Sequence, residues 1–333
     1  MPGDIAIEDW IRKIYDQYGQ RKEMGNSAPD VKLPHFFLHR TFLGDNDLLI
    51  IFNTKRCMYQ CYFCTLPYKS SKIPIATEDI VAQFKYVLEE MKNSLSVLDR
   101  LTFSNEGSVL DADTFPTDAL LTIAKGIKEL RRVRTWVFET RLEFVDPEVI
   151  KQVCDIAPRV KVDVLTGFET RDPYLRDKVL GKKEPLAMFE EGLDNIAKSG
   201  VTLSSYVLYK PSQTMTDDEA FTEAEESIDY LIEQCKVRGI KLNCIRINPM
   251  YSAKGSRWAK IAKENTLYKP PRITDVMKLA EKKTREGLRV YIGLSTEGLD
   301  DPGSSYLFRE DYQDALIKPI KLFNDGKIVS FGG

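Results

Sequence analysis

Short apolar runs alternate along the chain with longer segments whose apolar residues recur at helical spacing. The short runs predict strands at 47–54, 99–104, 134–139, 160–166, 201–209, 240–247 and 289–294. The longer segments predict helices at 77–95, 117–130, 147–156, 185–199, 217–236 and 273–286. A regular alternation of strand and helix is typical of a parallel sheet covered by helices.

Residues that typically begin and end helices occur at the predicted helix boundaries. Thr216 with Glu219 predicts a capping box, and Asp146 before Pro147 predicts a capped helix start. Three glycines follow predicted helices and precede predicted strands: Gly200, Gly239 and Gly287. The boundaries therefore have support that is independent of the apolar pattern.

A doubly wound open sheet and a partial (β/α) barrel both fit this alternation. The open sheet usually carries Gly-x-Gly-x-x-Gly after its first strand, but a cysteine-rich loop stands there instead. We therefore expect an α/β fold with a partial (β/α)6-type TIM barrel. The expected division is an N-terminal extension at 1–46, a barrel core at 47–250, and a C-terminal extension at 251–333 that caps the barrel. This last segment includes a predicted hairpin that turns at Asp325–Gly326.

Composition narrows the class of protein. The chain has 333 residues, of which 43% are apolar, enough for one large domain or two smaller ones. No basic region precedes an apolar run at the N-terminus, and no stretch approaches the roughly 20 apolar residues of a membrane span. We therefore expect a cytoplasmic protein without a membrane partner. The net charge of −2 favours a small or weakly charged substrate over a nucleic acid, although basic stretches occur at 125–134 and 254–263.

Three of the six cysteines, Cys57, Cys61 and Cys64, lie in one short loop after the first predicted strand. Six cysteines in 333 residues are too sparse for a disulfide framework. A structural zinc site needs four closed ligands, so it also requires one of the two histidines, His35 or His39. Three thiolates alone suit a 4Fe–4S cluster with one open iron, because clusters used only for electron transfer normally take four cysteines.

The cysteine spacing, with Phe63 just before the last cysteine, resembles the signature of radical S-adenosylmethionine (SAM) enzymes. The segment 47–250 is similar to the core of the Elongator catalytic subunit, the methylthiotransferases and the archaeosine-forming enzymes. The segments 137–144 and 208–211 are similar to the archaeosine-forming group. The resemblance implies a 4Fe–4S cluster on the three cysteines, SAM bound to the open iron, and an electron donor such as flavodoxin or ferredoxin. It also implies a 5′-deoxyadenosyl radical that abstracts hydrogen from the substrate.

Polar residues follow six predicted strands at their C-terminal ends, where parallel barrels hold their chemistry. The resemblance implies that the loop 105–108 contacts the SAM amino group and that Glu169 holds the ribose hydroxyls. It further implies that Arg141 or Arg171 pairs with the SAM carboxylate, a group that a guanidinium binds well. Phe63 and the backbone near 248–251 are expected to flank the adenine. The full set of expected cofactor-binding residues is Phe63, Asn105, Glu106, Gly107, Ser108, Glu139, Arg141, Glu169, Arg171, Lys210, Asn248 and Met250.

Side-chain alternation in the predicted strand 240–247 sets Cys244 and Arg246 on the lumen side of the barrel. A thiol there can return a hydrogen atom to a substrate radical and invert a carbon centre, as in some radical SAM sugar epimerases. The other interpretation of Cys244 is a buried cysteine that fills space. The expected substrate-side residues are Asp163, Ser204, Tyr206 and Arg246. Cys154 and Cys235 continue apolar helix stripes and are expected in the core.

These observations predict a radical SAM enzyme that acts on a small polar substrate. The preferred outcome is epimerisation of a sugar or natural-product intermediate, with Cys244 as the catalytic hydrogen donor. Modification of RNA, in particular tRNA, is the alternative among enzymes, and a non-catalytic zinc-binding protein is the alternative from another class. The chain has no second cysteine trio for an auxiliary cluster, which argues against methylthiotransferase chemistry.

Overall fold

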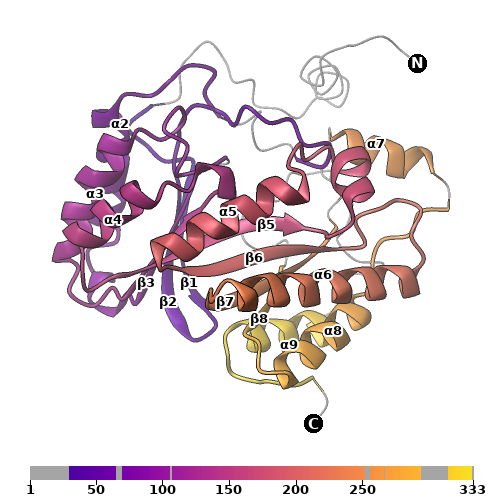
Figure 1. The fold of residues 1–333 in the computed structure, drawn as a ribbon. Helices are drawn as coiled ribbons and strands as arrows, with labels where there is room; N and C mark the ends of the chain where they lie inside the picture. Colours follow the sequence, from indigo (N-terminus) through magenta and orange to yellow (C-terminus); the bar gives the residue numbers. More distant parts are fainter. Residues whose placement is uncertain are drawn as a thin grey trace.

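A computed structural model describes residues 30–64, 70–105, 107–250, 252, 256–265, 267–293 and 314–331. Within these ranges, one sheet of eight strands runs in the order β1 to β8, and helices lie along its outer side (Figure 1). Strand β1 pairs antiparallel with β2, and every later pair is parallel. The predicted α/β class and the partial barrel are confirmed.

The predicted strands and helices are all present, with ends that shift by a few residues. The strands are β1 (Phe36–Phe42), β2 (Asp45–Ile51), β3 (Arg100–Ser104), β4 (Thr135–Glu139), β5 (Lys161–Glu169), β6 (Thr202–Tyr209), β7 (Leu242–Pro249) and β8 (Val290–Ile292). The helices are α2 (Thr77–Glu90), α3 (Thr117–Glu129), α4 (Pro147–Ile156), α5 (Leu186–Ser199), α6 (Asp217–Val237), α7 (Arg257–Glu264), α8 (Ile273–Arg285) and α9 (Asp314–Asn324).

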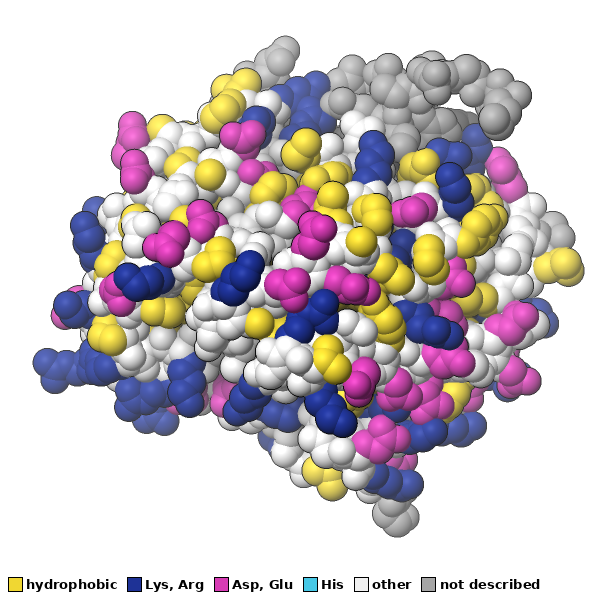
Figure 2. Space-filling model, viewed as in Figure 1, with side chains coloured by type: hydrophobic (Ala, Val, Ile, Leu, Met, Phe, Trp, Pro, Cys, Tyr) yellow, Lys and Arg dark blue, Asp and Glu magenta, His cyan; other side chains and the backbone are white. Residues whose placement is uncertain are grey.

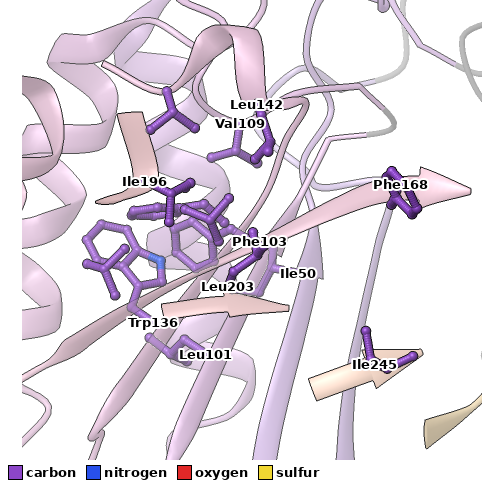
Figure 3. Packing of buried hydrophobic residues seen from close by; sticks show 14 of the residues in the cluster. Ile50, Leu101, Phe103, Val109, Trp136, Leu142, Phe168, Ile196, Leu203 and Ile245 are labelled. Carbon is purple, nitrogen blue, oxygen red and sulfur yellow. The ribbon is translucent and has the colours of Figure 1, made fainter. Parts of the chain in front are cut away.

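The two faces of the sheet differ because side chains alternate along each strand. The outer face packs against the helices in one apolar core that includes Phe103 and Trp136, whose rings meet edge to face at 5.2 Å (Figure 3). Cys235 belongs to this core and Cys154 packs against it, as predicted. The other face lines the barrel lumen and carries polar side chains such as Thr102 from β3. Hydrophobic burial on the outer face thus fixes which residues point into the lumen.

The predicted helix ends are also confirmed. Glu219 N donates to Thr216 Oγ1 at 3.2 Å, and Thr216 N donates back to the Glu219 carboxylate at 2.8 Å, so the capping box is complete. Asp146 caps α4 by accepting from Glu148 N at 2.9 Å. Gly200 ends α5 with a φ of 65°, a conformation that glycine adopts without steric cost.

Two parts of the sequence interpretation need correction. The predicted hairpin at Asp325–Gly326 is wrong, because the residues before the turn form helix α9. Its apolar residues Ile317, Ile320 and Phe323 recur at helical rather than strand spacing and are buried. The side chain of Asn324 then pairs with both backbone groups of Ile292, which satisfies the edge strand β8.

Strand β1 was not among the predicted strands; it lies within the expected N-terminal extension 1–46 and includes His39. Leu43 and Gly44 make the turn into β2 with φ values of 50° and 92°. Helix α7 was not predicted; it occupies most of the basic stretch 254–263.

Charged side chains of both signs cover the surface. Figure 2 shows Lys and Arg interspersed with Asp and Glu over α5 and α6, and Lys and Arg gathered at the lower left of the view. The exposed cations of the stretch 125–134 directly precede β4, so they lie at the amino-terminal ends of the strands. Among the described residues, no helix is both long and apolar enough to cross a membrane.

Candidate active site at the carboxyl ends of the strands

The cysteine loop follows β2 and is tied to two other segments by backbone hydrogen bonds. Tyr62 N donates to Leu180 O at 2.7 Å, and Trp258 N donates to Tyr62 O at 2.8 Å. Cys64 N donates to Cys61 O at 3.1 Å, which folds the loop into a turn between two of its cysteines. The loop is therefore held between the β5–α5 connection and helix α7.

Cys57, Cys61 and Cys64 are half-buried and form no disulfide. Burial raises the pKa of Cys57 to about 11 and also raises the pKa of Cys61. Lys182 and Arg141 act in the opposite direction on Cys61, since nearby positive charge favours a thiolate. Metal ligation requires the deprotonated thiol, so these two cations suit a site that holds an anionic cluster.

The three thiols on one loop match the donor set of a 4Fe–4S cluster with one open iron, in which each thiolate binds its own iron. The zinc alternative needs His35 or His39 as a fourth ligand, and His39 is exposed on β1. Among the described residues, no three His, Cys, Asp or Glu side chains are placed to hold a single ion.

The predicted loop 105–108 lies directly against the cysteine loop. A Cβ at Gly107 would stand 3.2 Å from Cys57 Cβ, so the glycine permits this close approach. The buried Asn105 amide donates to Ser108 O at 3.2 Å and accepts from Gly107 N at 3.2 Å, which shapes the loop. Ser108 Oγ accepts from Arg141 N at 3.0 Å. Glu106 lies outside the described residues.

The two arginines expected to bind the SAM carboxylate have their guanidinium groups engaged elsewhere. Arg141 is bound by Glu143 at 3.1 and 3.0 Å and by backbone carbonyls of the β5–α5 connection. Arg171 is half-exposed and pairs with Glu226 on α6. Lys210 is likewise paired, with Asp217 at the start of α6 at 2.8 Å.

A buried ionic network follows β5 and stands beside the thiols. Lys182 Nζ lies 3.7 Å from Glu169 and 3.3 Å from Glu184, and Lys182 is only 4% exposed. Arg176 donates to Glu184 Oε2 at 2.7 Å and to Thr170 O at 3.0 Å, so the network is fixed to the end of β5. Burial raises the pKa of Glu169 despite Lys182 and Arg176. For Glu184, burial opposes ionisation, but Lys182, Arg141 and Arg176 lower its pKa.

Backbone geometry marks the same strand ends. Glu169 and Lys210, which end β5 and follow β6, have φ values of 70° and 64°, a region that non-glycine residues rarely adopt. A turn of π-helix at Leu175–Val179 follows, a rare form that often occurs at functional sites. A Cβ at Gly167 would overlap Glu169 Oε1 and stand 3.2 Å from Lys182 Nζ, so the glutamate folds back over the glycine.

One layer below the rim, polar groups face the lumen. Glu139 accepts hydrogen bonds from Ser104 and Tyr206 and lies near Arg246, and burial of its carboxylate raises its pKa. Arg246 donates to Tyr206 Oη at 3.2 Å. Asn248 Oδ1 is buried without a hydrogen-bond partner in the described part of the chain. The layer thus combines a carboxylate, a guanidinium and an unsatisfied acceptor.

The carboxylate at the floor of the lumen is held by three hydrogen bonds. Asp163 accepts from Thr202 at 2.6 Å, Ser204 at 2.7 Å and Asn243 at 3.0 Å. Cys244 is 2% exposed and packs with Phe42 and Tyr291, and burial raises the pKa of its thiol to about 12. The lumen orientation of Cys244 agrees with the sequence pattern. Its packing is that of a core residue, and its role as a hydrogen donor stays a prediction.

An apolar patch completes the rim beside the cysteine loop. Met250 is buried with Leu180, Leu208 and Trp258, and Phe63 packs against them. Phe63 and Met250 were expected near the adenine, and they belong to the same apolar cluster.

Sequence reasoning missed Lys182, Glu184 and Tyr59. The signal for the first two was the length of the connection between β5 and α5, residues 170–185, because long connections in compact domains are usually functional. Nothing in the sequence pattern singled out Tyr59, because its contacts are with Arg141 and Glu143, which are distant in sequence.

Comparisons with known proteins agree with this arrangement. No family model matches the chain. It is 24% identical over 319 residues to an uncharacterised protein of Methanocaldococcus jannaschii, which covers 93% of this chain and 84% of that protein. It is 24% identical over 271 residues to the archaeosine synthase subunit beta of Thermococcus kodakarensis, which covers 81% of each protein.

Two solved structures share the fold. A mutant spore photoproduct lyase with bound S-adenosylmethionine aligns with a TM-score of 0.50 and 13% identity, over 86% of this chain and 95% of that one. The fold is that of the radical SAM enzymes. Streptococcus suis SuiB bound to S-adenosylmethionine also aligns with a TM-score of 0.50 and 13% identity, over 77% of this chain. The chain spans 53% of SuiB, about half of that longer protein.

The radical SAM resemblance that the cysteine loop predicted is therefore confirmed, and the archaeosine synthase relatives fit the predicted group. In the radical SAM fold of this chain, the cysteine loop, the loop at 105–108 and the Lys182 network meet at the carboxyl ends of β2 to β5.

Proposed function

We propose that this chain is a radical SAM enzyme that holds a 4Fe–4S cluster on Cys57, Cys61 and Cys64. The observation that carries the proposal is the position of these thiols, on one loop beside Arg141 and Lys182 at the carboxyl ends of the strands. A cluster held there supplies, when bound, the electron that cleaves SAM and starts radical chemistry on a substrate C–H bond. The chain's own residues bind and orient the reactants and exclude water.

Lys182 is the cation that we assign to the SAM carboxylate, because its contacts to Glu169 and Glu184, at 3.7 and 3.3 Å, are longer than the two hydrogen bonds that hold Arg141 on Glu143. Its charge acts on Cys61, and its ammonium lies 3.7 Å from Glu169, the residue expected to hold the ribose hydroxyls. Phe63 and Met250 supply an apolar surface for the adenine on the other side of the cysteine loop. The polar part of SAM then lies against Lys182 and Glu169, and its adenine lies against Phe63 and Met250.

The reacting part of the substrate belongs, in this proposal, in the layer below SAM. Glu139, a half-buried residue, offers there a carboxylate fixed by Ser104 and Tyr206. Arg246 and the unsatisfied Asn248 Oδ1 add a donor and an acceptor. This layer binds a polar, hydrogen-bonding group rather than an aliphatic one.

Anaerobic reconstitution followed by dithionite reduction tests the proposal. The expected protein is brown, carries about four irons, and releases 5′-deoxyadenosine from SAM. A colourless protein loaded with zinc contradicts the proposal. Lys182→Met should weaken SAM binding about tenfold, roughly the loss of one charge-assisted contact. The matched control is Lys283→Met, because Lys283 is equally buried among three carboxylates on the outer helices and lies far from the thiols.

For the substrate, we propose a nucleoside within RNA. The archaeosine synthase subunit beta relatives support this choice, since archaeosine is a modified RNA nucleoside. Helix α7 supports it further, because Arg257 stacks on Tyr62 of the cysteine loop at 4.1 Å. Arg257, Lys260 and Lys263 are exposed on this helix beside the cysteine loop, where Lys260 also pairs with Glu264 at 3.8 Å. Phosphates bind exposed cations through charge.

Gel-shift titration of the full chain with bulk tRNA tests the RNA proposal. Replacing Lys260 and Lys263 together by Ala should weaken binding and reduce the salt dependence by about two phosphate contacts. Replacing Lys128 and Arg131 by Ala is the matched control, since these cations lie at the opposite end of the strands. Equal effects of the two double variants, or no binding at low salt, would contradict the proposal.

Epimerisation through Cys244 remains the other candidate, because the thiol lies on the lumen side of β7. A Cys244→Ala variant is expected to cleave SAM normally under either hypothesis. Only under the epimerase hypothesis does it lose the inverted product made from a candidate sugar.

A further inference from the structure

Tyr59, Arg141 and Glu143 form one compact group against the cysteine loop, here named the loop clamp. Arg141 Cζ lies 3.7 Å from the centre of the Tyr59 ring. Arg141 Nε and Nη2 donate to the two carboxylate oxygens of Glu143 at 3.1 and 3.0 Å. The Tyr59 hydroxyl donates to the same carboxylate. Each member of the clamp thus contacts the other two.

The clamp joins three segments that are distant in sequence. Tyr59 belongs to the cysteine loop, and Arg141 and Glu143 follow β4. Arg141 Nη1 donates to Lys182 O at 3.0 Å, and Nη2 donates to Lys183 O at 3.3 Å, so the same guanidinium also holds the β5–α5 connection. Only a planar group with several fixed N–H donors can make all of these contacts, and a lysine cannot replace it.

The clamp also acts directly on the thiols. Tyr59 N donates to Cys57 Sγ at 3.4 Å, so the backbone that carries the tyrosine orients the first cysteine. Arg141 is 10% exposed and Glu143 is 14% exposed, so solvent screens their charges only weakly. The Arg141 charge acts on both Cys57 and Cys61, where it favours the thiolate.

We propose that Tyr59, Arg141 and Glu143 position the cysteine loop for the cluster, and that the Arg141 charge raises the reduction potential of the bound cluster. Reduction adds one electron at this site, and a nearby positive charge stabilises the added negative charge. The proposal rests on the proposed function, because it requires the cluster on the three cysteines.

Tyr59→Phe removes only the hydroxyl and is the first test. The matched control is Tyr230→Phe, since Tyr230 is also half-buried and donates to a glutamate, Glu190, but does so between α6 and α5. On the anaerobically reconstituted full chain, iron loss to EDTA should be about tenfold faster for Tyr59→Phe, as expected for one lost charged hydrogen bond. Tyr230→Phe should lose iron at the wild-type rate. Equal rates for the two variants overturn the proposal.

Two Arg141 variants separate geometry from charge. Arg141→Lys keeps the positive charge but loses the planar guanidinium with its several N–H donors. Iron loss should therefore accelerate, while the midpoint potential of the cluster stays near that of the wild type. Arg141→Gln loses the charge as well, so the midpoint potential of its cluster should also become more negative. Equal potentials for the two variants overturn the electrostatic part.

Iron binding by the wild-type protein distinguishes a failure of the proposed function from a failure of the clamp proposal alone. If it binds no iron at Cys57, Cys61 and Cys64, the proposed function fails, and the clamp fails with it. If it binds about four irons and the Tyr59 and Tyr230 variants behave alike, only the clamp fails.

Discussion

Strand β5 carries two lumen-facing carboxylates whose surroundings differ. Asp163, at the floor, lies in extended backbone and accepts three hydrogen bonds from neighbouring strands. Glu169, at the rim, has a φ of 70°, and its carboxylate is 3.7 Å from the ammonium of Lys182. Asp163 is satisfied by the fold itself, whereas Glu169 sits in a strained backbone with a raised pKa.

This difference separates a structural region from a functional one. Backbone strain and the raised pKa values of buried acidic groups cost stability, and both are concentrated at active and ligand-binding sites. At the rim, Glu169 combines a positive φ with a raised pKa, and burial raises the pKa of Cys57 and Cys61, whereas Asp163 at the floor lies in regular strand and accepts three hydrogen bonds. We therefore expect changes at the rim to alter ligand binding and changes at the floor to alter stability.

Gly167→Ala should produce the largest effect on the rim. Its new Cβ would overlap Glu169 Oε1 and press on Lys182, so both side chains must move. The affinity of the reconstituted protein for SAM should fall by about tenfold or more, and overpacking should cost about 1–3 kcal/mol of unfolding free energy. Gly126→Ala on α3 is the control, because its Cβ would meet only Phe84, at 3.3 Å. Calorimetric titration with SAM measures the difference, and an unchanged affinity would refute the assignment of Glu169 and Lys182.

Asp163→Ala should produce the complementary effect at the floor. The change leaves two hydroxyls and an amide without their acceptor, which should cost about 1–3 kcal/mol for the buried groups left unpaired. SAM affinity should stay at the wild-type value, because the rim does not move. Urea unfolding of the cluster-free protein and titration with SAM measure the two quantities. A loss of SAM affinity equal to that of Gly167→Ala would remove the distinction between floor and rim.

The sequence predicted the framework of this comparison but not its details. Strand positions followed from apolar patterns, and alternation along β5 placed Asp163 on the lumen side. Glu169 lies beyond a register shift at Gly167–Glu169, which the pattern did not predict. The three cysteines carried their own signal through their spacing. Helix α9 was missed because a turn pair, Asp325–Gly326, suggested a hairpin and outweighed the helical spacing of the residues before it.

The partners of charged rim residues were beyond sequence reasoning. Arg141 was expected to face SAM, and its true contacts, Glu143 and two backbone carbonyls, depend on how three loops pack. Lys182 was not singled out, because a lysine in a polar loop normally points into water. Only the tertiary structure reveals that it is buried beside Glu169.

The pH dependence of stability offers the finest test, at Glu139 in the layer between floor and rim. Burial raises the pKa of Glu139 above its ordinary value of 4.5, in spite of the hydroxyls of Ser104 and Tyr206 and the charge of Arg246. The folded state therefore holds this proton more tightly than the unfolded state, and its stabilising effect is lost as the pH rises through the folded pKa. Glu139→Gln abolishes this loss, so the variant should gain stability relative to the wild type as the pH rises from 4.5 toward neutrality. Glu184→Gln should show the opposite trend in a lower range, because Lys182, Arg141 and Arg176 lower the pKa of Glu184 below its ordinary value of 4.5. The wild type loses the stabilising effect of this carboxylate as the pH falls below 4.5, and the variant has no such loss. Urea unfolding of the cluster-free variants above and below pH 4.5 measures the two slopes, and parallel curves for Glu139→Gln and the wild type would mean that the Glu139 carboxylate is not enclosed.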